Sequence, residues 1–195
     1  MKNKLGISLF TGAGIGDLGF RSAGIEFVCM NELEVDRSSL AQLNFPAVDV
    51  VTGDAWDRWK DAVAVAEEQR EDIFFVSCTA PCQGMSKSGK GKLLREVREG
   101  RRPKLDLRNR LILPALEAIR AIRPQWVFFE NVSEMANTVI EDEAGELVFI
   151  LDLIERELGS EYVGAAYNLE FADYGVPQRR RRLLTIYTRS EPGRS

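Results

Sequence analysis

Short, continuous apolar runs alternate along the chain with longer segments whose apolar residues recur at helical spacing. The runs predict strands at residues 5–10, 27–30, 48–52, 73–80, 126–129, 167–171 and 183–188. The segments between them predict helices within residues 11–20, 35–43, 55–66, 106–122 and 147–158. This alternation indicates an α/β fold: a doubly wound, Rossmann-like sheet, mostly parallel, with an antiparallel strand near the C-terminus.

The fourth run stops at a proline and a cysteine, and a segment rich in Gly, Ser and Lys follows. Pro81 has no N–H to donate and pushes Ala80 toward an extended backbone, so the strand is expected to end there. Cys82 is then presented at the carboxyl end of a buried strand. Open α/β sheets bind their ligands at that edge.

The first two strands end in features typical of a nucleotide site. Gly12 and Gly14 follow the first strand, where glycines let a ligand approach the backbone and the first N–H groups of a helix. Glu32 ends the second strand, where a carboxylate in Rossmann-like sheets accepts hydrogen bonds from ribose hydroxyls. The alternative is that Glu32 or Glu34 only caps the helix at residues 35–43.

The third strand leads to Asp54, which can cap the next helix or accept a hydrogen bond from an adenine amino group. The apolar positions of that helix keep a 3, 4, 3 spacing, at Trp56, Trp59, Val63 and Ala66. We therefore expect both tryptophans to lie in the core, and not to form a stacking platform.

Two further features fall at strand ends and are expected to meet Cys82. Glu130 follows the strand at 126–129, and four consecutive arginines at 179–182 precede the last strand. A thiol, a carboxyl group and a guanidinium beside a nucleoside pocket suit the addition of a thiolate to an electron-poor ring. Taken singly, these features have plainer interpretations: a buried cysteine, a helix cap and a solvated surface run.

Length and composition favour one domain. The chain has 195 residues, of which 45% are hydrophobic, enough for one core, and no apolar run is long enough to span a bilayer. The N-terminus does not have the pattern of a cleavable signal, so we predict a cytoplasmic protein. Three cysteines without metal-type spacing and no histidine predict reduced thiols and no metal site.

Charge is unevenly distributed along the chain. The net charge is −4, yet residues 87–110 carry ten basic and three acidic side chains, a local +7, which leaves −11 for the remainder. A basic segment directly after the candidate cysteine indicates a polyanionic substrate. The alternative is a solvated surface insertion.

Several stretches, in this order, carry a family resemblance. They are residues 10–14 with 17–20, Asn31-Glu32, Gly53-Asp54, residues 81–86 with Gly89, residues 106–109, residues 130–132, and residues 174–178 with Arg180 and Arg182. Together they resemble the cytosine-5 DNA methyltransferases, which use S-adenosylmethionine. The resemblance spans nearly the whole chain.

This resemblance implies a role for each matched residue. Cys82 would attack carbon 6 of a flipped-out cytosine, Glu130 would hold or protonate ring nitrogen 3, and Arg182 with Arg180 would contact the nucleotide. The S-adenosylmethionine site would comprise Phe10, Thr11, Gly12, Gly14, Glu32, Asp54, Ala55 and Pro81. The partner would be a cytosine-containing DNA duplex, in the setting of a restriction-modification system.

The sequence departs from the family pattern at a few positions. Ile15-Gly16 replaces Gly-Gly, and Met85 replaces a phenylalanine. We expect residues 1–195 to form the catalytic domain only, without the target recognition domain that the resemblance implies after the last strand. We therefore expect a truncated or split enzyme whose second subunit supplies that domain. A non-catalytic cofactor- or DNA-binding protein, or the same chemistry on tRNA, are the alternatives.

Overall fold

The computed structural model describes residues 4–69, 73–81, 99–100 and 107–190. Its largest feature is a seven-stranded sheet in the order β3-β2-β1-β4-β5-β9-β8. The strands are β1 (Lys4–Leu9), β2 (Ile25–Glu32), β3 (Asp49–Thr52), β4 (Phe75–Cys78), β5 (Trp126–Asn131), β8 (Tyr162–Glu170) and β9 (Arg181–Arg189). All neighbouring pairs from β3 to β5 are parallel, and β9 is antiparallel to both β5 and β8. The predicted fold class is confirmed, including the antiparallel strand near the C-terminus.

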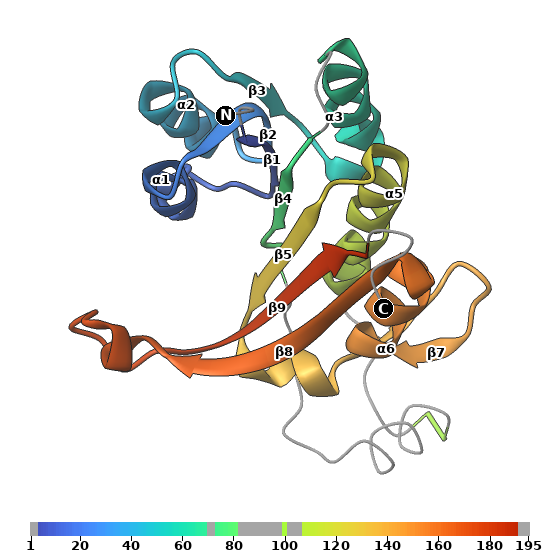
Figure 1. The fold of residues 1–195 in the computed structure, drawn as a ribbon. Coiled ribbons are helices and arrows are strands. Elements are labelled where there is room, and N and C mark those ends of the chain that lie inside the picture. The colour runs from blue at the N-terminus through green and yellow to red at the C-terminus, as the bar shows by residue number, and fades with distance from the viewer. Residues whose placement is uncertain (1–3, 70–72, 82–98, 101–106, 191–195) are drawn as a thin grey trace.

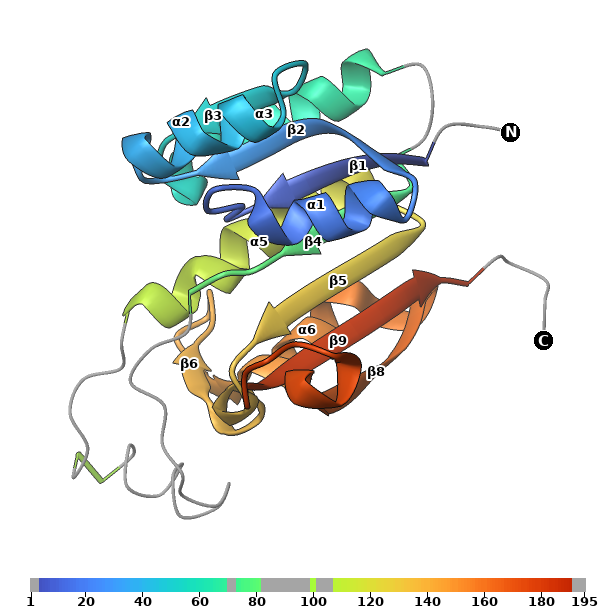
Figure 2. The ribbon, with the colours of Figure 1, turned by 90° about the vertical axis from the view of Figure 1, so that its left-hand side faces the viewer.

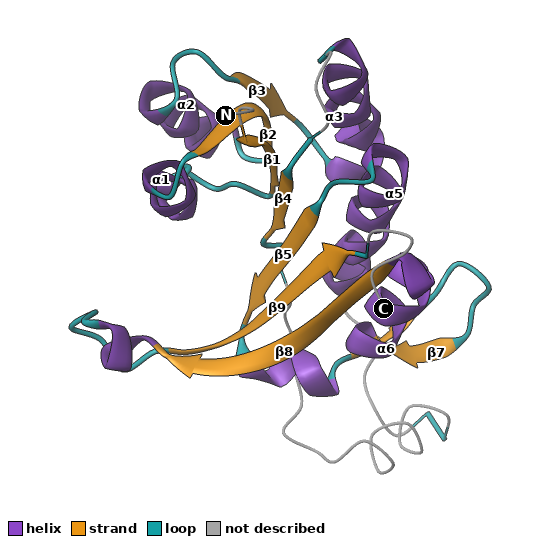
Figure 3. Ribbon diagram, viewed as in Figure 1, coloured by secondary structure: helices purple, strands orange, loops and turns teal. Residues whose placement is uncertain are grey.

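Helices cover both faces of the sheet (Figures 1 and 3). They are α1 (Ile15–Ser22), α2 (Val35–Asn44), α3 (Ala55–Glu68), α5 (Ile112–Ile122) and α6 (Ile150–Leu158). Figure 2 shows α1 and α2 on one face, with α5 and α6 behind the sheet. Short 3-10 turns complete the connections: η1 (Leu107–Leu111), η2 (Ser133–Asn137), η3 (Gly159–Glu161) and η4 (Phe171–Tyr174). None of the helices in the described part of the chain is long and apolar enough to cross a membrane.

The two faces of the sheet carry different cores. The larger core joins β1, β4, β5 and β9 to α3, α5 and α6 through aliphatic side chains such as Ile7, Val76 and Ile119. The smaller core is aromatic: Phe20 of α1 lies 4.7 Å from Phe75 and 5.0 Å from Phe128, between ring centroids. Apolar burial on both faces explains why the central strands read as continuous apolar runs.

Proline and aspartate set two of the helix boundaries as expected. Pro114 lies in the first turn of α5, where a missing N–H costs nothing, and α5 ends before Pro124. Asp54 caps α3, since its Oδ1 accepts the N–H of Trp56 at 3.0 Å. The prediction that both tryptophans are core is wrong for Trp56, whose side chain is 44% exposed. Because α3 begins at the carboxyl edge of the sheet, its first turn lies beyond the strands that would cover it.

The segment at 138–149 also differs from the prediction. Residues 147–149 belong to a small hairpin, β6 (Val139–Glu141) with β7 (Leu147–Phe149), and not to the helix that follows. Asp142 shapes the connecting turn: its carboxylate accepts N–H bonds from Glu146 and Ala144, and Arg156 of α6 binds it at 2.9 Å. These bonds, the Glu146 N–H above all, lower the pKa of Asp142.

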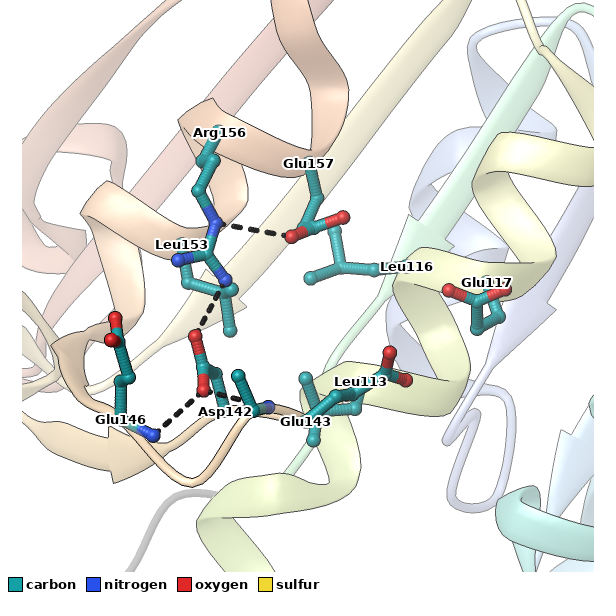
Figure 4. A pocket seen from close by; sticks show the side chains of 10 residues that line it. Leu113, Leu116, Glu117, Asp142, Glu143, Glu146, Leu153, Arg156 and Glu157 are labelled. Carbon is teal, nitrogen blue, oxygen red and sulfur yellow. Dashed lines mark hydrogen bonds and ion pairs between the residues drawn. The ribbon is translucent and has the colours of Figure 1, made fainter.

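The turn of the β6–β7 hairpin forms one wall of a pocket of about 390 Å³ between α5 and α6 (Figure 4). Arg156 points from α6 toward both Asp142 and Glu157, and Leu113 and Leu116 line the α5 side. Since the buried carboxylate is satisfied by the turn and by Arg156, we assign this pocket a structural role.

The last two strands form an arm that extends beyond the body of the molecule and ends in η4 (Figure 1). β8 begins at Tyr162, five residues before the predicted strand, because it pairs with β9 along its whole length. As the edge of the sheet it is largely exposed, including Val163 at 60% and Tyr167 at 51%. Such a partly exposed strand lacks the continuous apolar pattern by which buried strands are recognised.

Candidate functional site

The turn after β1 has the backbone geometry of a ligand cradle. Gly12 and Gly14 have φ of 60° and 74°, and Phe10 adopts a left-handed φ of 61° although it has a side chain. A Cβ on Gly14 would lie 2.9 Å from the Phe45 ring, whereas a Cβ on Gly12 would meet nothing within 4 Å. Gly14 is therefore required by packing, and Gly12 leaves open space beside the backbone.

Glu32 closes this cradle from the end of β2. Its side chain is almost completely buried, Oε2 accepts the Gly12 N–H at 2.8 Å, and Oε1 accepts the Glu34 N–H at 3.1 Å. Glu34 occupies the N-cap of α2 but makes no capping hydrogen bond with its side chain. Glu32 thus joins the glycine turn to the start of α2, which a simple helix cap would not do.

The end of β3 lies next to this cradle. Asn31 donates through Nδ2 to the carbonyl oxygens of Val51 and Gly53, at 3.0 and 3.1 Å. This pair of bonds holds the exit of β3 beside the end of β2. Asp54 and the buried Ala55 follow directly, so the structure brings the predicted cofactor residues of the first three strands to one sheet edge.

Pro81 is half-buried and lies after the end of β4, and Cys82 is outside the described residues. The residues that lead to Pro81 are held on both sides. Thr79 donates through its hydroxyl to the Phe10 carbonyl at 2.8 Å. Asn131, at the end of β5, donates through Nδ2 to the Ala80 carbonyl at 2.7 Å. The approach to Cys82 is therefore tied both to the glycine turn and to the strand that carries Glu130.

Glu130 and Arg182 form an ion pair, whereas the predicted meeting of both with Cys82 lies outside the described residues. Arg182 Nε lies 2.8 Å from Glu130 Oε1, with side chains 14% and 27% exposed. Antiparallel pairing of β5 with β9 aligns Glu130 with Leu184, two positions from Arg182 on the same face. Arg180 is not part of this pair: its side chain is exposed, and its carbonyl accepts the N–H of Phe171.

A polar pocket of about 680 Å³ lies beside this ion pair. Its lining comprises Val132, Ser133, Glu134, Asn168, Leu169, Glu170, Asp173, Arg181 and Arg182. Within the described residues, the buried atoms Ser133 Oγ and Glu170 Oε1 have no hydrogen-bond partner. The lining is polar and of mixed charge, with two arginines and three carboxylates, and Arg181 Nε lies 3.4 Å from Glu170 Oε2.

The two described cysteines are unsuited to nucleophilic chemistry. Burial raises the pKa of both Cys29 and Cys78 to about 12, with Asp49 and Asp61 adding to the effect at Cys29. Such thiols stay protonated at neutral pH and behave as core residues.

Sequence reasoning missed two groups that organise the site. Asn131 lies in the motif at residues 130–132, which predicts no separate role for it, and no sequence pattern predicts a role for Asp17, a buried polar residue in a short helix. An asparagine next to a strand-end glutamate occurs twice, in Asn31-Glu32 and Glu130-Asn131. That repeated pairing was the available signal, because each side chain holds the exit of the neighbouring strand.

Solved structures share this Rossmann-like fold. An E. coli prophage protein described as a DNA modification methyltransferase superposes with a TM-score of 0.72, at 21% identity, over 95% of this chain and 46% of the other. Dnmt2 from S. pombe gives a TM-score of 0.63 at 17% identity, covering 98% of this chain and 50% of its own.

Sequence comparison then identifies the family. The model of the C-5 cytosine-specific DNA methylases matches residues 5–193, so the chain belongs to that family. The methyl donor of this family is S-adenosylmethionine.

Individual relatives agree with this assignment. The chain is 34% identical to the type II methyltransferase M1.HgaI of Avibacterium volantium, covering 94% of this chain and 49% of the relative. It is 30% identical to M.AquIA of Picosynechococcus sp., covering 97% of this chain and 73% of the relative. The chain therefore spans about half the length of M1.HgaI and a larger share of M.AquIA.

Proposed function

We propose that this chain is the catalytic part of an enzyme that transfers a methyl group from S-adenosylmethionine to carbon 5 of a flipped-out cytosine in DNA. One observation carries the proposal: the Glu130–Arg182 pair lies at the same sheet edge as the exit of β4, which leads to Cys82. The glycine turn and Glu32 border that exit from the other side.

The residues at the ends of β1 to β3 fit S-adenosylmethionine. Gly12 leaves room for a ligand against the backbone, and each oxygen of Glu32 accepts one N–H and has a second lone pair for a ribose hydroxyl. Asp54 and Ala55, at the exit of β3, would hold the adenine. When bound, the cofactor supplies an electrophilic methyl group on a positively charged sulfur.

The protein side of the reaction begins with addition to the base. The thiolate of Cys82 forms a bond to carbon 6, and the electron pair of the ring double bond moves toward carbon 5, as Glu130 holds or protonates nitrogen 3. Carbon 5 then takes the methyl group as the methyl–sulfur bond of the donor breaks, and the donor sulfur leaves as a neutral thioether. A water molecule or a carboxylate would accept the proton from carbon 5, and elimination of the Cys82 thiolate restores the double bond of the ring.

Arg182 would orient Glu130 toward the base and contact the flipped nucleotide. A bond from Nε leaves other guanidinium N–H groups to donate to a phosphate or to the base. Arg180, exposed in the arm, would be available to the DNA backbone. Since a base inside a duplex is out of reach, the cytosine must be extruded into this site.

Covalent trapping tests the proposal. The chain, alone and with a partner polypeptide carrying a recognition domain, would be incubated with S-adenosylmethionine and a duplex containing 5-fluorocytosine. We expect an adduct stable to denaturation that Cys82→Ser abolishes and Cys78→Ala, the matched core control, retains. Cofactor binding without any adduct would instead support a non-catalytic binding protein, and an adduct formed only on tRNA would change the substrate.

The remaining part of the proposal concerns the target recognition domain, which a second polypeptide or further sequence would supply. The chain spans about half the length of M1.HgaI, and β8 exposes Val163 and Tyr167 along the free edge of the sheet. We infer that residues 1–195 form one catalytic domain and that the target recognition domain comes from outside it. Full, sequence-specific methylation by the purified chain alone would refute this inference.

A further inference from the structure

The carboxyl group of Asp17 lies beneath the glycine turn, among hydroxyl groups of other segments. Its side chain is almost completely buried in the first turn of α1. Asp17 Oδ2 accepts the Thr11 hydroxyl, and Oδ1 lies 3.3 Å from Ser77 Oγ, which is itself 3.0 Å from Ser8 Oγ. One carboxyl group thus joins α1 to the turn, to β1 and to β4.

The burial of the Asp17 carboxyl group is electrostatically unfavourable. Burial raises the pKa of Asp17, although hydrogen bonds from Thr11, Ser8 and Ser77 oppose the shift. A carboxyl group in a dry site costs free energy that an apolar residue would not. Since its bonds reach other segments, its contribution goes beyond capping its own helix.

These bonds belong to a set that fixes the whole turn. Thr11 is held twice, because its hydroxyl binds Asp17 and its N–H donates to the Asn31 carbonyl at 3.0 Å. The next N–H, of Gly12, donates to Glu32. Asp17 and Glu32 therefore hold successive residues of the turn from two different elements.

The residues on either side are held as well. The Phe10 carbonyl accepts the Thr79 hydroxyl at 2.8 Å, and the Ala13 carbonyl accepts Nδ2 of Asn44 at 2.9 Å. Four consecutive residues, Phe10 to Ala13, are thus tied to other parts of the fold, and two of them, Phe10 and Gly12, have a left-handed φ. A turn held in this way has little conformational entropy left to lose when a ligand binds.

We propose that Asp17 is a positioning residue for S-adenosylmethionine: through the Thr11 hydroxyl it holds the turn at residues 10–14 in its binding conformation without touching the cofactor. This inference rests on the proposed function and deepens it. Glu32 would contact the ligand, whereas Asp17 acts only through the turn.

The test compares variants that break the Asp17–Thr11 bond with variants that keep it. Asp17→Ala and Thr11→Val remove the bond, whereas Asp17→Asn and Thr11→Ser retain an acceptor or a hydroxyl. Dissociation constants for S-adenosylmethionine would be measured by calorimetry at a temperature where every variant is folded. We expect Asp17→Ala and Thr11→Val each to bind about tenfold more weakly, as for one lost hydrogen bond to a charged or buried group. Asp17→Asn and Thr11→Ser should stay within about threefold of the parent.

The double variant tests whether the two residues act together. If Asp17 acts through Thr11, the double variant with Asp17→Ala and Thr11→Val should bind S-adenosylmethionine no more weakly than whichever single variant binds it less well. Fully additive losses would overturn the proposal. So would an Asp17→Ala protein that melts earlier yet binds the cofactor like the parent, because that outcome describes a purely structural residue.

A second measurement needs no cofactor. Amide hydrogen exchange at residues 11–14 of the ligand-free protein should be faster in Asp17→Ala than in the parent and unchanged in Asp17→Asn. If Glu32→Ala abolishes binding while Asp17→Ala leaves both binding and exchange unchanged, only the Asp17 inference fails. If the parent binds no cofactor, the proposed function fails, and the exchange rates still decide whether Asp17 orders the turn.

Discussion

Glu32 and Glu130 lie at the carboxyl ends of two strands, along the same edge of the sheet. Different groups hold the two side chains in place. Glu32 is almost completely buried, and backbone N–H groups of nearby turns bind both of its oxygens. Glu130 is 27% exposed and is bound by Arg182, a side chain from the last strand. In the proposed site, the half that would bind the cofactor is thus built by its own connecting turns, whereas the half that would carry the chemistry depends on a strand that returns from far along the chain.

Each glutamate also has an asparagine beside it that holds the exit of the adjacent strand. Asn31 binds the carbonyls of Val51 and Gly53, and Asn131 binds that of Ala80. The same kind of hydrogen bond therefore holds the exit of β3 and the exit of β4. This comparison predicts that substitutions in the half with Glu32 should weaken cofactor binding, and that substitutions in the half with Glu130 should slow methyl transfer.

The largest expected effect is on chemistry. In the presence of whatever partner activity requires, Glu130→Gln should lower the rate of methyl transfer by about 10²–10⁴-fold, the usual contribution of a general acid or base. The dissociation constant for S-adenosylmethionine should change little, because Glu32 and the turn remain. Glu155→Gln, an exposed position on α6, is the control. A parallel loss of cofactor affinity would contradict the separation of the two halves.

The converse substitution should act on binding. Glu32→Ala removes a buried charged acceptor, and we expect about 10–100-fold weaker binding of S-adenosylmethionine, as for the loss of a charge-assisted hydrogen bond. Equilibrium dialysis with labelled cofactor would measure it. At saturating cofactor the rate of methyl transfer should largely recover. A rate that stays low at saturation would assign Glu32 to the chemical step.

Smaller effects are expected from the paired asparagines. Asn131→Ala leaves the buried Ala80 carbonyl unsatisfied, which should lower the free energy of unfolding by about 1–3 kcal/mol in urea titrations. It should also slow adduct formation at Cys82, whereas Asn31→Ala should weaken cofactor binding. If the two variants affect both properties equally, the asparagines serve overall stability and not the separate halves.

The smallest effect concerns pH. The folded pKa of Asp17 is raised above its ordinary value of 3.8 by burial, so the folded state binds more protons than the unfolded state above that pH. The free energy of unfolding should therefore fall as the pH rises from about 3.8 through the folded pKa. The Asp17→Asn protein should not show this decline. Its free energy of unfolding, relative to that of the parent, should therefore increase toward neutral pH. Urea titrations from pH 4 to 8 would show it, and identical slopes would contradict it.

Much of the architecture followed from local patterns. Continuous apolar runs located the five parallel strands, because the central ones are buried on both faces, and Asp54 and Pro114 marked helix starts through their own chemistry. The local patterns did not predict the β6–β7 hairpin or the first half of β8, because these strands are short or exposed. Trp56 was misplaced because helical spacing says nothing about where the sheet beneath a helix ends.

For the site, sequence alone determined which residue types stand at strand ends: the glycine turn, Glu32, Asp54 and Glu130. Periodicity and turn chemistry are local, so they can be read along the chain. Only the tertiary structure decided that Arg182 and not Arg180 meets Glu130, and that Asp17 lies beneath Thr11. Those contacts depend on strand register and on packing between distant segments, which local pattern does not encode.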